Sequence, residues 1–156
     1  MSGIIGGAGS KSGVIGETEI DYEEGTWTPA LYGNSNGSDP NGYGYRSGFY
    51  TKIGRLVTCQ FYLHYNSVGT NSGSYMVLKD LPFVQSAAWW GGVSSVLLFQ
   101  NNASNSLGMG LQIADGNNFC YVYYFTSSGS SITYFPVSGG LGSTSKITGA
   151  LTYFTA

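Results

Sequence analysis

Apolar and polar residues alternate with a period of two along much of this chain. In the clearest segment, 55–65, one face carries Val57, Cys59, Phe61, Leu63 and Tyr65, and the other carries Thr58, Gln60, Tyr62 and His64. Such alternation is typical of a β-strand with one buried face. Cys59 falls on the apolar face and the chain has no CxxC pair, so we expect a buried free thiol.

Two later segments show the same period. Segment 106–114 sets Leu107, Met109, Leu111 and Ile113 against Gly108, Gly110, Gln112 and Ala114. Segment 119–126 carries large residues on both faces, so we expect one face to pack in the core and the other to meet a neighbouring subunit. We predict that the centre of the core consists of Val57, Phe61, Leu63, Leu111 and Ile113.

Further strands are predicted at 26–32, 74–79, 92–99, 131–135 and 147–154. Turn-forming sequences rich in Gly, Asn and Ser separate these segments, and no stretch has the 3.6-residue period of an amphipathic helix. About eight short strands with such turns predict an all-β fold, namely an antiparallel β-sandwich, most simply of jelly-roll type.

The composition supports a single folded domain and excludes several kinds of partner. A chain of 156 residues with 15% aromatic residues can bury one sizeable core, although only 9% of its residues are charged. The six basic residues are scattered, which argues against a nucleic-acid partner. No apolar run approaches the ~18 residues of a membrane span, so we expect no membrane insertion. A signal-peptide pattern is missing, so we expect synthesis in the cytoplasm.

The composition also divides the chain into two parts. Residues 1–24 are predicted to form an extended, glycine-rich N-terminal anchoring arm with an acidic linker, and residues 25–156 form the β-sandwich domain. The arm contains a short repeat, SGIIG followed ten positions later by SGVIG, which cannot build a core alone. The acidic stretch 17–24 is either a solvated hinge or a cation site on an oligomer axis. The hinge is favoured because no glycine-punctuated calcium loop is present.

Catalytic and cofactor patterns are missing from the sequence. His64 is the sole histidine, and it lies on the polar face of a strand without a nucleophile motif. The segment GSKS at 9–12 lacks the glycine that directly precedes lysine in a phosphate loop. Asp39, Asp80 and Asp115 each lie in turn sequence rather than in a carboxylate pair. We expect no catalytic residue, no metal ligands and no cofactor, and hence no enzyme.

Aromatic residues near polar turns are the candidates for recognition. Tyr43, Tyr45 and Tyr50 lie beside a loop rich in Asn, Ser and Gly, and Trp89 and Trp90 precede two glycines. Aromatic rings stack on sugar faces while amides and hydroxyls bond sugar hydroxyls, so these five residues are candidate glycan contacts. The same residue types also fill sandwich cores and subunit interfaces, and that alternative stays open.

Three sequence blocks carry a resemblance to a known family. They are YEEGTWTP at 22–29, GFYTKIGRLV at 48–57 and LPF at 81–83. Their order resembles a domain of bacteriophage virion proteins, especially the fibre and decoration proteins of marine phages. The resemblance implies structural display on a virus particle, assembly as a homotrimer, and a first strand in which Trp27 is buried beside Pro29.

The resemblance and the arm together predict a virion structural protein, either a capsid decoration or a short fibre. We expect Ile4, Ile5, Val14 and Ile15 to anchor the arm on a phage capsid or tail protein. The alternative is a tail-fibre receptor-binding tip whose sandwich recognises a host surface polysaccharide. In both cases the protein also contacts copies of itself, and its location is the virion.

Overall fold

The fold consists of β-strands in the part of the chain that the structure describes. The computed structural model describes residues 21–86, 93–94, 98–100, 108–113, 116–125 and 132–155. Its strands are β1 (Tyr22–Trp27), β2 (Ala30–Gly33), β3 (Gly42–Ile53), β4 (Leu56–Ser67), β5 (Met76–Lys79), β6 (Val93–Ser94), β7 (Leu98–Gln100), β8 (Gly108–Ile113), β9 (Cys120–Phe125), β10 (Ile132–Tyr134) and β11 (Lys146–Phe154). All pairs among these strands are antiparallel. The predicted all-β antiparallel sandwich is confirmed, and its jelly-roll type stays a prediction.

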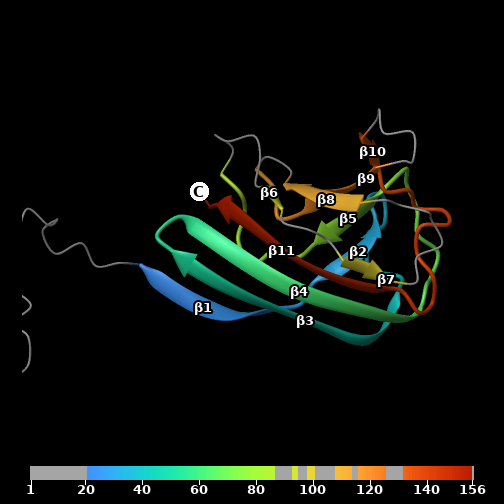
Figure 1. Cartoon of the computed structure of the whole chain (residues 1–156), viewed down its shortest axis with the longest axis horizontal. Helices are drawn as coiled ribbons and strands as arrows, with labels where there is room; N and C mark the ends of the chain where they lie inside the picture. Colours follow the sequence, from blue (N-terminus) through green and yellow to red (C-terminus); the bar gives the residue numbers. More distant parts are fainter. Residues whose placement is uncertain are drawn as a thin grey trace, which may run out of the picture.

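The strands form two layers that share one continuous path of pairing. The order along this path is β1-β3-β4-β11-β6-β8-β9-β5-β2, with β7 added to β11 and β10 added to β9. In Figure 1, β1, β3, β4 and β11 lie side by side as the first layer, and β6, β8, β9, β5 and β2 form the second layer across from it. Buried residues of both layers make up one apolar core.

Strand β3 is the element that the sequence analysis did not predict. Its 12 residues pair with β1 on one side and with β4 on the other, so it lies inside the first layer. The register with β4 shifts between Gly42 and Tyr45. A bulge inserts an extra residue, so the alternation along the sequence changes phase at this point and the period of two is hidden.

The predicted strand 26–32 is wrong as a single element. Strand β1 ends at Trp27 and β2 begins at Ala30, and these two strands lie at opposite ends of the pairing path. Pro29 stands between them. Because proline has no N–H for a ladder hydrogen bond, the chain leaves the first layer here and enters the second.

The sandwich also begins earlier than predicted. Strand β1 starts at Tyr22, so residues 22–24 belong to the first layer and not to a linker. The rest of the predicted arm, residues 1–20, lies outside the described residues, as do parts of the predicted strands 92–99 and 131–135.

Strand β4 supplies the centre of the core, as its alternation predicts. The five predicted core residues are each at most 6% exposed and belong to one cluster: Val57, Phe61, Leu63, Leu111 and Ile113. The first three come from β4 and the last two from β8, so the two layers meet at this point. The predicted core centre is confirmed.

An aromatic ring lies over a glycine at two positions of the β1–β3 ladder. Trp27 pairs with Gly48, and a Cβ atom at Gly48 would overlap the Trp27 indole ring. Tyr50 pairs with Gly25 and covers it in the same way. The rings replace the packing that glycine lacks, so these pairs fix the register of β1 on β3. Trp27 is buried as predicted. Its ring packs edge-on against the Phe61 ring, with 6.1 Å between the ring centroids.

Both cysteines are buried free thiols, which confirms the prediction for Cys59. Burial raises the pKa of the Cys59 thiol to about 12, and it also raises the pKa of Cys120. Burial raises the pKa of the Tyr65 phenol as well. These groups therefore stay protonated in the folded chain at pH values at which they ionise in the unfolded chain.

Phe61→Ala and Leu63→Ala should each lower the free energy of unfolding by roughly 2–5 kcal/mol, because each removes buried contacts and leaves a cavity. Urea unfolding followed by tryptophan fluorescence measures the change. Gln60→Ala, on the exposed face of the same strand, is the matched control and should stay within ~0.5 kcal/mol of the parent. Equal stability of Phe61→Ala and Gln60→Ala would contradict the assigned face.

Stability should fall as the pH rises from about 9 toward 12. The unfolded Cys59 thiol ionises near its ordinary pKa of 9.0, whereas the folded one keeps its proton up to about 12. The folded state then binds more protons than the unfolded state, so the free energy of unfolding decreases with pH. Urea midpoints across this window measure the slope, and Cys59→Ala should make it shallower. A constant midpoint would show that the prediction is wrong.

Candidate interaction surface

The outer face of the first layer carries most of the exposed apolar side chains. We call the solvent-facing side of β1, β3, β4 and β11 the outer face. Among the described residues eight large hydrophobic side chains are exposed, and the register places six of them on this face: Tyr22, Tyr45, Phe49, Ile53, Leu56 and Phe154. Apolar side chains gathered in this way mark a contact surface.

Four of these side chains form a row across all four strands. Tyr22 pairs with Ile53, Ile53 pairs with Leu56, and Leu56 pairs with Phe154. Their exposed fractions are 57%, 50%, 38% and 49% in that order. We call these four residues the apolar row. Because neighbouring strands are ~4.8 Å apart, the apolar row is about 14 Å long.

A two-residue turn sets the position of the apolar row. Gly54 and Arg55 connect Ile53 to Leu56, and Gly54 has a φ of 57°. A positive φ at the first turn residue fits a type II′ hairpin, which glycine adopts without steric cost. The Gly54 N–H donates to the Asp21 carbonyl at 2.7 Å. The start of β1, the β3–β4 turn and the end of β11 therefore lie together at one end of the first layer (Figure 1).

Outside the apolar row, the outer face carries Phe49 and Tyr45 among polar side chains, few of which are charged. The row next to the apolar row consists of Glu24, Thr51, Thr58 and Thr152, and the hydroxyl oxygens of Thr58 and Thr152 lie 3.3 Å apart. Besides Glu24, the charged side chain on the four strands of this face is Lys146, near the opposite end of the sheet. Such a surface offers little to phosphate or to anionic lipid.

Asparagine side chains join two loops at the other end of the first layer. The loops are 34–41, between β2 and β3, and 68–75, between β4 and β5. Asn34 Oδ1 accepts two backbone N–H bonds from the second loop, at 2.9 and 3.2 Å, and Asn36 Oδ1 accepts one at 2.6 Å. We call Asn34, Asn36, Asn41 and Asn71 the asparagine brace.

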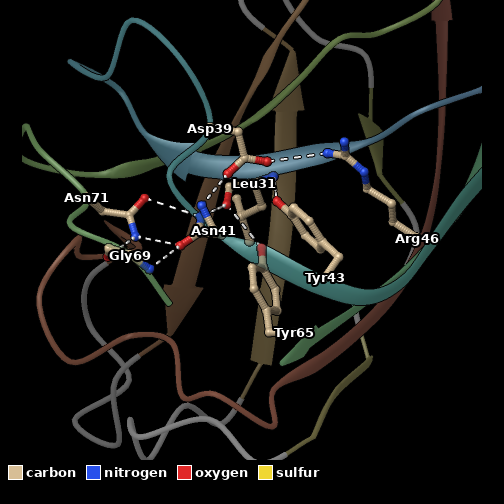
Figure 2. Close-up of polar contacts among 8 residues, drawn as sticks. All are labelled: Leu31, Asp39, Asn41, Tyr43, Arg46, Tyr65, Gly69 and Asn71. Carbon is tan, nitrogen blue, oxygen red and sulfur yellow. Dashed lines mark hydrogen bonds and ion pairs between the residues drawn. The ribbon is translucent and has the colours of Figure 1, made fainter. Parts of the chain in front are cut away.

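Asn41 and Asn71 form the centre of the asparagine brace (Figure 2). Asn71 Nδ2 donates to Asn41 Oδ1 at 3.0 Å, and Asn41 Nδ2 donates to the Leu31 carbonyl at 3.0 Å. Asn41 Oδ1 also accepts from the Gly69 N–H at 3.1 Å, and Asn71 Oδ1 accepts from the Gly33 N–H at 3.0 Å. Both amides are used internally, so they serve to hold the loops rather than to bond a ligand.

Two tyrosines extend the asparagine brace into the core. The Tyr65 hydroxyl donates to the Leu31 carbonyl at 3.0 Å, and the Tyr43 hydroxyl accepts from the Leu31 N–H at 3.2 Å. The two rings lie 4.8 Å apart between centroids, and burial raises the pKa of both phenols. The Arg46 guanidinium carbon lies 4.6 Å from the centroid of the Tyr43 ring. Arg46 also forms an ion pair with Asp39, with 3.4 Å between the guanidinium nitrogen and the carboxylate oxygen (Figure 2).

The structure places the three described candidate glycan contacts on two different sides of one strand. Tyr43, Tyr45 and Tyr50 all lie on β3, but Tyr43 and Tyr50 belong to its inner side and Tyr45 to the outer face, because the bulge changes the phase. The Tyr50 hydroxyl donates to Glu23 at 2.6 Å, and its ring packs edge-on against Phe83 at 5.2 Å. Of these three tyrosines Tyr45, at 57% exposure, is the one open to a ligand.

The remaining predicted site residues lie outside the described residues: Trp89, Trp90, Ile4, Ile5, Val14 and Ile15. The same is true of Glu17 and Glu19 in the acidic stretch. Asp21 forms an ion pair with Lys52, and Glu24 Oε2 accepts from the Tyr22 hydroxyl at 2.6 Å. No group of three or more potential metal ligands occurs in the part of the chain that the structure describes.

Comparison with known proteins assigns no family to this chain, since no family model, no curated protein and no solved structure matches it. Within the described ranges, no helix is long and apolar enough to cross a membrane. The interpretation of the outer face therefore depends on its own geometry.

Sequence reasoning missed the outer face because it missed β3. The pattern of β3 is inverted: its outer positions include Tyr45, Phe49 and Ile53, while its inner positions include Arg46 and Lys52. Hydrophobicity alone would assign the apolar side of this strand to the core. The signal that could have identified the strand is the two-residue turn GR at 54–55, directly before the alternating segment 56–65.

Asn41→Ala should lower the free energy of unfolding by roughly 1–3 kcal/mol, because it removes the hydrogen bonds that the Asn41 amide makes with the Leu31 carbonyl, the Gly69 N–H and the Asn71 amide. Thermal and urea unfolding measure the effect. Asn66→Ala, at an exposed position of β4, is the control and should change stability by at most ~0.5 kcal/mol. If both variants unfold at the same urea concentration, the asparagine brace does not stabilise the fold.

Proposed function

We propose that this chain is a bacteriophage virion structural protein that is displayed on the particle surface as a capsid decoration or a short fibre. The sandwich, of jelly-roll type, is the displayed module, and the N-terminal arm attaches it to a capsid or tail protein. Copies of the chain are its other partners, and a homotrimer is the assembly that the resemblance implies. The protein acts by binding and display rather than by catalysis.

The observation that carries the proposal is that the three resembling blocks converge on one structural unit. YEEGTWTP contains β1, and GFYTKIGRLV contains the end of β3, the turn and the start of β4. In LPF, the Phe83 ring packs against the Tyr50 ring. The Phe83 N–H donates to the Tyr153 hydroxyl at 3.2 Å, and this hydroxyl donates to the Phe83 carbonyl at 3.1 Å. Blocks that build one unit together favour a shared fold over a chance match of short sequences.

The surface chemistry also supports display in a crowded array. A net charge of -2 over 156 residues gives little repulsion between neighbouring copies. The outer face adds exposed apolar side chains, which can contact other copies or the particle. The asparagine brace holds the loops at the other end in one conformation, which suits a structural role.

A receptor-binding tip that recognises host polysaccharide is the second candidate. One aromatic pair favours it: the rings of Tyr45 and Tyr62 lie 5.8 Å apart on the outer face, and Tyr45 is 57% exposed. Such a pair can stack on a sugar face. The internal hydrogen bonds of Tyr43 and Tyr50 weigh against it, since they remove two of the predicted contacts.

Immunogold labelling of intact particles of the phage that encodes this chain tests whether the protein is part of the virion, which both candidate functions require. Label on the capsid or the tail supports virion display, and its absence from purified particles contradicts it. Titration of the isolated protein with host surface polysaccharide tests the second candidate. Binding that Tyr45→Ala abolishes would favour a receptor-binding tip, and absence of binding would argue against it.

Removal of residues 1–16 should leave a folded sandwich that no longer joins the particle, because the arm supplies the apolar anchor. Co-sedimentation of the protein with particles that lack it measures attachment, and the melting temperature checks the fold. A full-length variant in which Ile4, Ile5, Val14 and Ile15 are all changed to Ser keeps the length of the arm and should also lose attachment. Full occupancy by the truncated chain would place the attachment surface on the sandwich.

A further inference from the structure

We propose that the outer face pairs two copies of this chain, sheet against sheet, about a two-fold axis that runs along the strands between β3 and β4. The starting observation is the apolar row, whose four members are each 38–57% exposed although they pair in register across the sheet. The inverted pattern of β3 also supports a contact on this face, because Phe49 and Ile53 lie on the side that the core does not cover.

The chemistry of the apolar row is self-complementary. Read from β1 to β11, it runs aromatic, branched aliphatic, branched aliphatic, aromatic. The proposed axis passes between Ile53 and Leu56, so it exchanges the β1 position with the β11 position and β3 with β4. Tyr22 of one copy then faces Phe154 of the second copy, and Ile53 faces Leu56. The contacts are reciprocal, as a two-fold contact between identical patches requires, and they match aromatic with aromatic and aliphatic with aliphatic side chains.

The charges on the outer face are compatible with the same axis. Glu24 faces Thr152 of the second copy, whose hydroxyl can donate to the carboxylate. In the same row Thr51 faces Thr58. Lys146 pairs with His64, beyond the end of β1 at Trp27, so no strand of the second copy places a charge opposite it. Like charges would weaken such a contact, and this arrangement opposes none.

The exposed area also fits a second copy. An aromatic side chain presents ~200 Å², so the four exposed aromatics of this face, at about half exposure, supply about 400 Å². A stable interface buries about 800 Å² per partner, and the remainder is available from Ile53, Leu56 and the threonine row. Two twisted sheets pack ~10 Å apart with strands aligned to within about 30°, which keeps a 14 Å row in contact with its copy. A nucleic acid or an anionic membrane would need a basic cluster that these strands lack.

Light scattering coupled to size exclusion, at about 50 µM protein, tests the pairing. We expect a mass of two chains, each of 16.5 kDa, or of six chains if a threefold contact on another surface also forms. A mass of one or three chains would overturn the two-fold pairing. The particle-labelling experiment is independent of this result, so failure of virion display and failure of the pairing can be told apart.

Two single variants test the face and its axis. Ile53→Glu and Leu56→Lys, each alone, should halve the mass, since both place a charge in the apolar row. In an equimolar mixture of the two variants the parent mass, that of two or six chains, should return. The carboxylate introduced at position 53 of one variant then faces the ammonium introduced at position 56 of the other. Thr133→Glu, at an exposed position of β10 in the second layer, is the matched control and should keep the parent mass.

Melting temperatures check that each variant is folded, and recovery of the mass on mixing is a second check. Single variants that keep the parent mass would show that the outer face is not the contact. Single variants that dissociate but do not pair with each other on mixing would show that the axis is wrong.

Discussion

The register of the β3–β4 hairpin is the constraint on which the rest of the structure depends. A two-residue turn that begins with Gly54 places Ile53 opposite Leu56, and every pair along the two strands up to the bulge follows from that position. A slip of one residue would turn Val57 and Leu63 to solvent. The same register holds β1 on the free edge of β3, where Trp27 fills the space above Gly48. The core and the outer face are therefore set by one turn.

Polar side chains and backbone groups hold the two ends of the first layer through hydrogen bonds. At one end the asparagine brace ties two loops through Leu31, and the Tyr65 hydroxyl carries that connection into the core. At the other end the Gly54 N–H binds the Asp21 carbonyl, and Arg55 Nε donates to the Thr155 carbonyl at 3.0 Å. These hydrogen bonds satisfy backbone N–H and C=O groups that have no partner in the strand ladders, so they hold the chain in place at both ends of the sheet.

Two cations occupy inner positions of β3 beside aromatic rings. The Arg46 guanidinium lies over the Tyr43 ring, and the Lys52 ammonium lies 5.8 Å from the Phe83 ring centroid, so these two inner positions hold charged side chains at the margin of the core. The apolar residues of the strand are left on the outside. A surface of this kind is costly to leave in water, which is the physical reason for proposing that a second copy covers it.

The sequence by itself determined the parts of the fold in which period and burial agree. Strand β4, the core around Phe61 and the buried Cys59 thiol all follow from alternation, because a strand with one covered face must place its apolar residues there. The tertiary structure alone decided that β3 lies between β1 and β4 with its apolar residues outward, that Pro29 divides one predicted strand between two layers, and that Tyr43 and Tyr45 lie on opposite sides. Alternation gives the spacing of side chains, but a bulge changes its phase, and which face is covered depends on strands that are distant in the sequence.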